Sequence, residues 1–153
     1  MGLKESVESE MRAALKAKNA ERLGVFRMLL AAFQNREIEK RAKTGERELS
    51  DAEATAVLRS EVKKRKDAIM EFTKGGRQDL ADKESRECAI LEPYLPAEMS
   101  DEEIEKLLLP LAKGASTADF GKVMGAAMKA VAGRASGERV AAAVKKLLND
   151  SAD

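Results

Sequence analysis

Apolar residues recur along almost the whole chain at the three- and four-residue spacing of amphipathic α-helices, and no segment alternates as a β-strand would. Between them stand mostly Ala, Leu, Glu, Lys and Arg, which favour helix, while Val, Ile and Thr are scattered. The pattern therefore predicts an all-α, multihelical protein. The expected helices cover about residues 3–18, 21–41, 51–74, 79–94, 101–109, 117–131 and 137–148.

Two capping boxes and a pair of prolines mark the main boundaries. Ser50 and Ser100 are each followed three residues later by Glu, a spacing at which the two side chains satisfy backbone amides at a helix start. Pro93 and Pro96 prevent a helix from continuing through this segment. We expect an N-terminal four-helix subdomain over 1–94, a C-terminal three-helix bundle over 97–149 and a disordered tail over 150–153.

Single residues predict further details of the helices. Pro110 should kink or end the fifth helix near Leu109, because proline lacks the amide hydrogen that a helix interior needs. Arg65 lies among the apolar positions of the third helix, so its side chain should snorkel out to solvent. Methionines at helical spacing are expected to fill the cores: Met11, Met28, Met70, Met124 and Met128.

The composition excludes several kinds of chemistry. The 153 residues include no His, no Trp and a single Cys, Cys88. A disulfide framework, a Cys/His zinc site and a histidine base are therefore excluded, and Cys88 is expected to be a small core residue. Aromatic residues make up 3%, too few for a platform that stacks single-stranded nucleic acid. We expect neither a metal nor a cofactor.

Hydropathy bears on the location of the protein. No apolar run approaches the length of a membrane span, and no signal-peptide stretch follows the first residues. Apolar residues at 44% and charged residues at 36% predict a folded chain with a heavily charged surface. We expect a cytoplasmic protein without a membrane partner.

Charge is nearly balanced overall, at +1, but it is unevenly distributed. Residues 98–105 carry acids and no base. Residues 116–149 carry six bases and two acids, a net of +4, which suits a phosphate backbone but is also common on proteins that bind none. A second basic run, Lys63 to Lys66, occupies successive helix positions that point in four directions, so its members cannot all face one ligand.

Two glycine patterns have alternative interpretations. Gly121 and Gly125 lie four apart on one helix face, where they could admit a ligand backbone or let another helix approach, and we favour the helix. The segment from Gly133 to Gly137 could form an anion-binding nest before the last helix, but a simple interhelical turn fits it better.

Five short motifs follow one another along the chain. They are Arg22-Leu23-(x)3-Arg27-Met28-Leu29, Glu71-Phe72-(x)2-Gly75-Gly76-Arg77-Gln78-Asp79-Leu80, Glu92-(x)-Tyr94-Leu95-Pro96, Gly121-Lys122-Val123-Met124-Gly125 and Gly133-Arg134-Ala135-(x)-Gly137. Together they resemble the GatB/YqeY family, and most closely its stand-alone YqeY-like proteins. The motif residues expected to have a structural role are Gly75, Arg77, Asp79, Tyr94, Leu95, Pro96, Gly121 and Gly125.

This resemblance implies a fold of two all-helical subdomains. It also implies kinship with the C-terminal tail of the B subunit of the glutamine-dependent aspartyl/glutamyl-tRNA amidotransferase, which helps to hold the tRNA while a separate core performs the chemistry. The family label of carbon–nitrogen ligase with glutamine as amido-N-donor does not follow from these residues, because no nucleotide-binding loop or glutaminase nucleophile is recognisable. We therefore expect no catalytic residue in this chain.

Three hypotheses follow. The leading one is a non-catalytic module that binds tRNA or structured RNA through its phosphates. The second is an accessory subunit that joins amidotransferase or tRNA-synthetase components and serves the ligase reaction in trans. The third is a protein–protein adaptor without an RNA role. The residues expected to carry RNA binding are Lys122, Lys129, Arg134, Lys145 and Lys146, with Gly133 and Gly137 allowing close approach.

Overall fold

The computed structural model describes residues 2–151. This part of the chain contains no strand, so the prediction of an all-α, multihelical fold is confirmed. The α-helices are α1 (Leu3–Lys16), α2 (Ala20–Thr44), α3 (Asp51–Lys74), α4 (Gln78–Leu91), α5 (Asp101–Ala112), α6 (Phe120–Val131) and α7 (Gly137–Ser151). Two short 3-10 helices, η1 (Glu92–Tyr94) and η2 (Thr117–Asp119), complete the described secondary structure.

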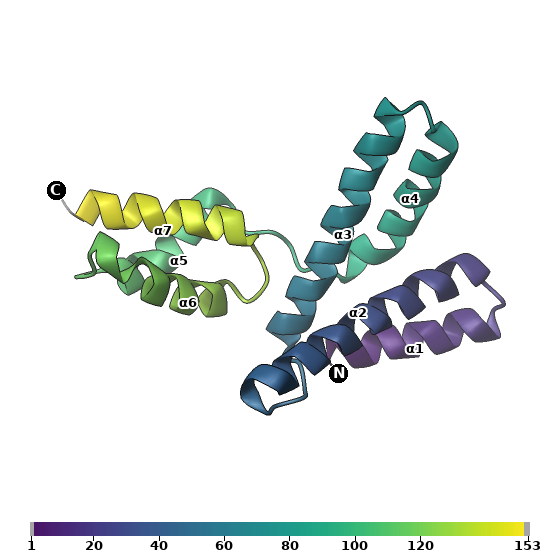
Figure 1. Cartoon of the computed structure of the whole chain (residues 1–153), viewed down its shortest axis with the longest axis horizontal. Coiled ribbons are helices and arrows are strands. Elements are labelled where there is room, and N and C mark those ends of the chain that lie inside the picture. Colours follow the sequence, from purple (N-terminus) through teal and green to yellow (C-terminus); the bar gives the residue numbers. More distant parts are fainter. Residues whose placement is uncertain (1, 152–153) are drawn as a thin grey trace. The chain divides into compact units, whose positions relative to one another are not determined.

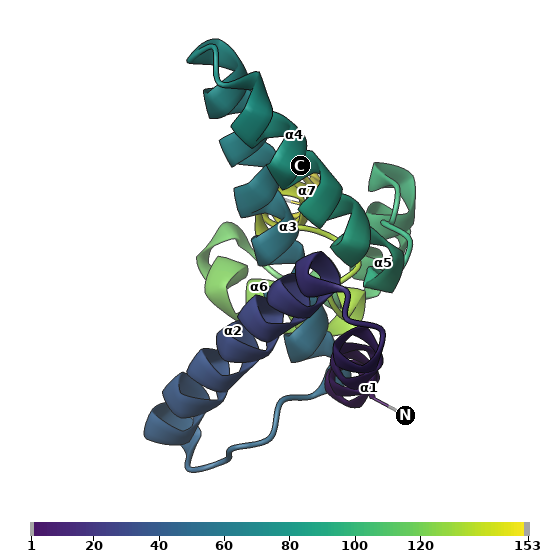
Figure 2. The ribbon, with the colours of Figure 1, turned by 90° about the vertical axis from the view of Figure 1, so that its right-hand side faces the viewer.

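The chain folds into two compact units, unit 1 over Met1–Leu95 and unit 2 over Pro96–Asp153. Unit 1 consists of two helical hairpins, α1–α2 and α3–α4 (Figures 1 and 2). Unit 2 holds α5, α6 and α7. Each unit has a hydrophobic core of its own.

The core of unit 1 lies where its two hairpins meet. Phe26, Phe33 and Leu58 are almost completely buried there, and the ring of Tyr94 packs edge-on against Phe26 with 5.7 Å between ring centroids. No member of this core cluster falls between Val62 and Cys88. The distal part of the α3–α4 hairpin therefore extends beyond the core as a two-helix arm, visible in Figure 1.

The turn at the tip of this arm explains part of the second motif. Gly76 has a φ of +73°, and the amide of Arg77 donates to the carbonyl of Phe72 at 2.8 Å, as in a Schellman C-cap. The side chain of Arg77 then donates two hydrogen bonds to Asp79, each 3.1 Å long, beside the start of α4. Gly75, Arg77 and Asp79 thus lie within one compact turn.

The prediction that the side chain of Arg65 extends to solvent is wrong. The residue is buried, and its guanidinium forms ion pairs with Glu84, at 3.1 Å, and with Glu87, both on α4. Nη2 also donates to the sulfur of Met28 on α2 at 3.8 Å. Two carboxylates on the facing helix hold this charge inside the arm, a partner arrangement that the pattern of a single helix does not reveal.

Unit 2 is a three-helix unit whose core includes Ile104, Leu108, Val140 and Val144. The segment before α5 is attached to it through the backbone of Met99. The Met99 amide donates to the carbonyl of Arg134 at 2.9 Å, and its carbonyl accepts from Arg139 at 2.7 Å.

Pro110 was predicted to kink or end α5 near Leu109. The helix continues to Ala112, so it does not end there. Proline here removes only one hydrogen bond, to the carbonyl of Lys106, in the last turn of the helix. Lys106 and Pro110 are both exposed, so water can satisfy that carbonyl.

Several methionines also differ from the prediction. Met28, Met70 and Met128 are 58%, 56% and 37% exposed, so they do not fill the cores. At the C-terminal end, α7 extends through Asp150 to Ser151, and the rest of the tail expected to be disordered, 152–153, lies outside the described residues.

Candidate functional site

The outer face of α6 presents an uncompensated positive charge. Lys122 and Lys129 are both exposed and lie seven residues apart, so they share one side of the helix. Within residues 2–151 neither makes an ion pair, and α6 itself contains no acidic residue. These two predicted site residues are therefore available to an anion.

Gly121 and Gly125 lie on the exposed side of the same helix. A Cβ placed on either glycine would meet no heavy atom within 4 Å among the described residues. The favoured interpretation was that these glycines admit a neighbouring helix. It is wrong, because no helix among the described residues packs against them. The helix surface between the two lysines is instead open to solvent.

The loop between α6 and α7 begins with two residues in the left-handed conformation, Ala132 with a φ of +49° and Gly133 with a φ of +78°. Ser136 then starts α7, because its Oγ accepts from the amide of Arg139 at 3.3 Å and its carbonyl accepts from Val140 at 3.0 Å. Gly133 is buried, whereas Arg134 and Gly137 are exposed. An ordinary helix-capping turn accounts for these hydrogen bonds.

The basic residues of unit 2 are not equivalent. Lys146 pairs with Glu105 of α5 at 2.8 Å, and Arg139 pairs with Asp101 at 2.8 Å and with Glu98 at 3.6 Å. Glu105 raises the pKa of Lys146 above its usual value. The acids of the 98–105 run thus offset part of the positive charge that the sequence assigns to α7.

The remaining two predicted cations are Lys145 and Arg134. Lys145 lies over the ring of Phe120, with Nζ 5.9 Å from the ring centroid, and it forms no ion pair within the part of the chain that the structure describes. The pKa of Glu103 is lowered mainly by its hydrogen bonds with Ser100 and to a smaller extent by the charge of Arg134. Of the five predicted cations, Lys122, Lys129 and Lys145 are therefore the least neutralised.

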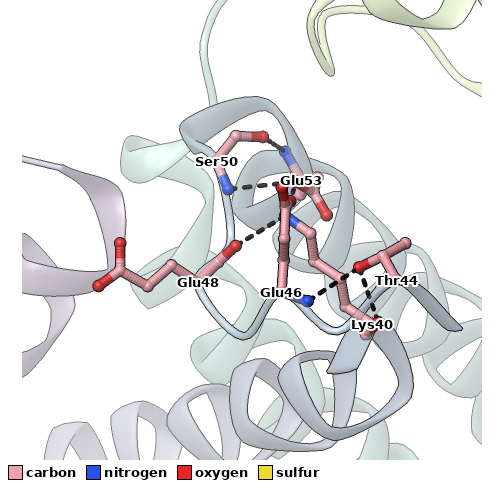
Figure 3. Close-up of polar contacts among 6 residues, drawn as sticks. All are labelled: Lys40, Thr44, Glu46, Glu48, Ser50 and Glu53. Atoms are coloured by element: carbon pink, nitrogen blue, oxygen red, sulfur yellow. Dashed lines mark hydrogen bonds and ion pairs between the residues drawn. The ribbon is translucent and has the colours of Figure 1, made fainter. Parts of the chain in front are cut away.

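A polar cluster that sequence reasoning missed lies at the connection between α2 and α3 (Figure 3). Lys40 donates to the carbonyl of Glu48 at 2.7 Å and to the carboxylate of Glu53 at 2.8 Å, and Glu46 lies 3.6 Å away. Glu53 also completes the capping box with Ser50. The capping box of Ser50 and Glu53 was predicted from the sequence. The sequence did not indicate that Lys40, from the preceding helix, reaches Glu53.

These contacts set the ionisation of the cluster. The hydrogen bond from Lys40 is the largest cause of the lowered pKa of Glu53, and the same bond raises the pKa of Lys40. The neighbouring depression is open and shallow, about 480 Å³, and is lined by Lys40 and residues 46–50. Because the lysine is saturated by its own chain, the cluster fastens the loop rather than offering a charge to a ligand.

The thiol of Cys88 is not activated. Burial, with a hydrogen bond to Glu92, raises the pKa of the Cys88 thiol, so it stays protonated near neutral pH. Among residues 2–151 no three His, Cys, Asp or Glu side chains converge to hold a metal ion. No helix of the same range is long and apolar enough to cross a membrane.

Fold and surface together define a class of protein, an all-helical chain of two units with an exposed cationic helix on the second. The family model of the Yqey-like protein family matches residues 4–148. The chain therefore belongs to this family, and the predicted resemblance to stand-alone YqeY-like proteins is confirmed.

Curated relatives include fungal proteins named altered inheritance of mitochondria protein 41, mitochondrial. The one from Clavispora lusitaniae is 33% identical over 82% of this chain and 72% of its own length. The one from Kluyveromyces lactis is 33% identical over 60% of this chain and 48% of its own length. The one from Pyrenophora tritici-repentis is 26% identical over 84% of this chain and 71% of its own length.

These relatives overturn one expectation from the sequence. Each of the three carries a name that places it in mitochondria, so the prediction of a cytoplasmic location is wrong. Absence of an apolar leader or span in the sequence is a weak guide to compartment, because transit peptides are amphipathic and charged rather than apolar.

Proposed function

We propose that this protein is a non-catalytic module that binds structured RNA, of which tRNA is the leading candidate, through the phosphate backbone. The observation that carries the proposal is the exposed face of α6. There Lys122 and Lys129 have no ion pair within the described residues, and the nearby positions of Gly121 and Gly125 are open. Resemblance of the chain to the tRNA-holding tail of the amidotransferase B subunit supports the same ligand class.

The spacing of the two lysines suits a polyanion. Seven residues of α-helix span about 10 Å, and one strand of a duplex places a phosphate at about every 3.4 Å along the axis. Gly121 and Gly125 present no side chain toward a ligand, so a backbone can approach the helix closely. Base readout is not part of the proposal, because aromatic residues are only 3% of the chain.

The ion pairs refine the set of contact residues. Lys145 and Arg134 can add phosphate contacts, whereas Lys146 is already paired with Glu105. Arg139 is engaged with Asp101 and the Met99 carbonyl, which gives it a structural role in unit 2. We therefore propose an interface formed by α6, Arg134 and Lys145, rather than by every base of residues 116–149.

The test is binding of labelled total tRNA by fluorescence anisotropy at 50 and 200 mM salt, with a 20-base-pair RNA duplex as a second ligand. The variant Lys122→Gln/Lys129→Gln should reduce the salt dependence, because each phosphate contact contributes about 0.7–0.9 to the logarithmic slope. The matched control is Lys106→Gln/Lys113→Gln, which removes two exposed charges, one from α5 and one from the residue that caps its C-terminal end. We expect the control to keep most of the wild-type slope.

Equal losses in the two double variants would mean that net charge alone drives binding, and would contradict a specific face. Absence of wild-type binding at 50 mM salt would overturn the proposal. Pull-down of amidotransferase components would then test the accessory-subunit hypothesis, and a partner search would test the adaptor hypothesis.

A further inference from the structure

The outer side of α2 carries a row of uncharged residues. Its six members follow each other at steps of four, three, four, three and four residues, so they share one side of the helix over about 27 Å. None of the six is charged, although charged residues make up 36% of the chain. We call this row the α2 seam; it consists of Gly24, Met28, Ala31, Asn35, Ile38 and Ala42.

The α2 seam is open to solvent among the described residues. All six members are exposed, and the two largest, Met28 and Ile38, are 58% and 68% exposed. A Cβ placed on Gly24 would meet no heavy atom of the described residues within 4 Å. The buried residues of this helix, such as Phe26 and Phe33, lie on its opposite side, in the core of unit 1. The helix therefore has an apolar face toward the core and a second uncharged face away from it.

The spacing of the seam distinguishes it from ordinary exposed apolar residues. Single exposed apolar side chains are common on protein surfaces. Alternating steps of three and four residues are instead the pattern of helices that pack side by side as a coiled coil. The sulfur of Met28 accepts a hydrogen bond from Arg65 at 3.8 Å, which attaches this side chain without covering it. The seam is thus arranged to receive another helix.

Asn35, near the middle of the seam, indicates which helix that is. In two-stranded coiled coils a single Asn among apolar seam positions specifies the register and the number of strands, at some cost in stability. A parallel, in-register pair of α2 helices places Asn35 of one copy opposite Asn35 of the second copy, where the two side-chain amides can bond to each other. Met28 and Ile38 then each face their own counterpart as well.

The residues beside the seam favour the parallel direction. Arg27, Gln34 and Arg41 follow one edge of the seam, and Ala32 and Glu39 follow the other. In a parallel pair, each residue of the first edge lies near the residue five positions further along on the second copy, so Gln34 meets Glu39 and Arg27 meets Ala32. In an antiparallel pair, equal edges meet, and Arg27 would approach Arg41 with like charge.

We propose that the α2 seam is a docking surface for a second copy of this chain, which binds it as a parallel pair of α2 helices. Self-complementary spacing, the central Asn35 and the edge charges select this occupant. A nucleic acid does not fit the seam, because the seam carries no cation. The seam spans about three heptads, the short end for such pairs, so we expect a dimer that dissociates in the micromolar range. This inference does not depend on RNA binding by α6.

The first test is sedimentation equilibrium of the full chain from about 5 to about 200 µM, where we expect the wild type to pass from monomer to dimer. Ile38→Glu puts a charge into the seam and should raise the dissociation constant of the dimer at least about tenfold. The matched control is Met70→Glu, which alters a 56% exposed apolar residue of α3. It should leave the constant within about twofold of the wild type. Circular dichroism should give the same helix content for both variants.

Cysteine cross-linking then reports the direction of pairing. The native Cys88 is buried and its thiol stays protonated, so it does not interfere. Met28→Cys and Ile38→Cys are made separately and oxidised with diamide. In a parallel pair each should form a disulfide with its own counterpart, whereas in an antiparallel pair two positions about 15 Å apart along the helix cannot both do so. Gln34→Cys, exposed at the edge of the seam, is the control and should cross-link at least about tenfold more slowly.

Each contrary result overturns a stated part of the inference. A wild type that stays monomeric at about 200 µM would overturn the dimer, and a helix of a different protein would then be the candidate partner of the seam. Equal dimerisation of Ile38→Glu and Met70→Glu would show that the copies associate through another surface. Cross-linking at position 28 or 38 alone would overturn the parallel direction. These outcomes leave the proposed function intact, because Lys122→Gln/Lys129→Gln tests tRNA binding separately.

Discussion

Glycines in this chain occupy two physically different kinds of position. Gly76 has a φ of +73° at the tip of the arm, a conformation that side-chain-bearing residues rarely adopt. Gly125 is not constrained by the described residues, since a Cβ there would contact none of their heavy atoms within 4 Å. The same residue type is therefore required by the backbone in one place and costs helix stability in the other.

We expect Gly76→Ala to lower the free energy of unfolding by about 1 kcal/mol, because alanine is strained at positive φ. Gly125→Ala should raise it by up to about 1 kcal/mol through helix propensity, which makes it a control of opposite sign. Urea unfolding followed by circular dichroism measures both. Equal effects of the two substitutions would contradict these assignments.

At the same scale, Arg65 is the partner of two carboxylates with side chains 24% and 14% exposed. Arg65→Met should lower the free energy of unfolding by about 2–4 kcal/mol, because it leaves Glu84 and Glu87 together without a cation. Adding Glu84→Gln and Glu87→Gln to that variant should recover much of the loss. Arg86→Met, which breaks the exposed pair with Glu21, should cost under about 1 kcal/mol in the same urea titration.

At the scale of elements, the connection between α2 and α3 depends on one lysine. Lys40 bonds to the carbonyl of Glu48 and to Glu53, which itself caps α3 with Ser50 (Figure 3). The side chain of Leu49 packs against the core of unit 1 from the same loop. The loop is thus fixed by one polar and one apolar attachment.

This cluster predicts a dependence of stability on pH. Because the pKa of Glu53 is lowered in the folded protein, its contribution is complete above the usual value of 4.5 and is lost as the pH falls through the folded pKa. Because the pKa of Lys40 is raised, its contribution is complete below 10.5 and is lost as the pH rises through the folded pKa.

Lys40→Met should therefore lose less stability than the wild type between pH 5 and about pH 3, since Glu53 no longer has its cation. Urea midpoints at pH 7, 5, 4 and 3 measure this difference. Lys43→Met, an exposed neighbour on α2, is the control and should follow the wild type. Parallel curves for Lys40→Met and the wild type would show that the lysine does not set the acid response.

At the scale of the whole molecule, residues 2–151 form two hydrophobic clusters with no residue in common. Leu108 is fully buried in the hydrophobic cluster of unit 2, whereas the adjacent Leu109 is 59% exposed. A cavity made in one cluster removes packing from that unit alone. Local stability should therefore differ between the units when one core is damaged.

Leu108→Ala should destabilise unit 2 by about 3 kcal/mol and accelerate amide exchange there about a hundredfold, while protection in unit 1 stays unchanged. Hydrogen exchange read by mass spectrometry on peptides from each unit is the measurement. Leu109→Ala is the matched control, with an expected change under about 0.5 kcal/mol. Loss of protection in both units would show that their stabilities are coupled.

The helices could be predicted from local sequence, because helix propensity, capping boxes and apolar spacing are properties of residues close together in the chain. Thus Ser50 and Ser100 mark the starts of α3 and α5 as expected. What lies opposite each helix face depends on the tertiary structure. Two carboxylates of α4 pair with the buried Arg65, and Glu105 of α5 pairs with Lys146. The surface beside Gly121 and Gly125, in contrast, is open among the described residues. Periodicity shows which residues share a face, but only packing determines whether another helix or solvent covers it, and that difference sets which charges remain available to a ligand.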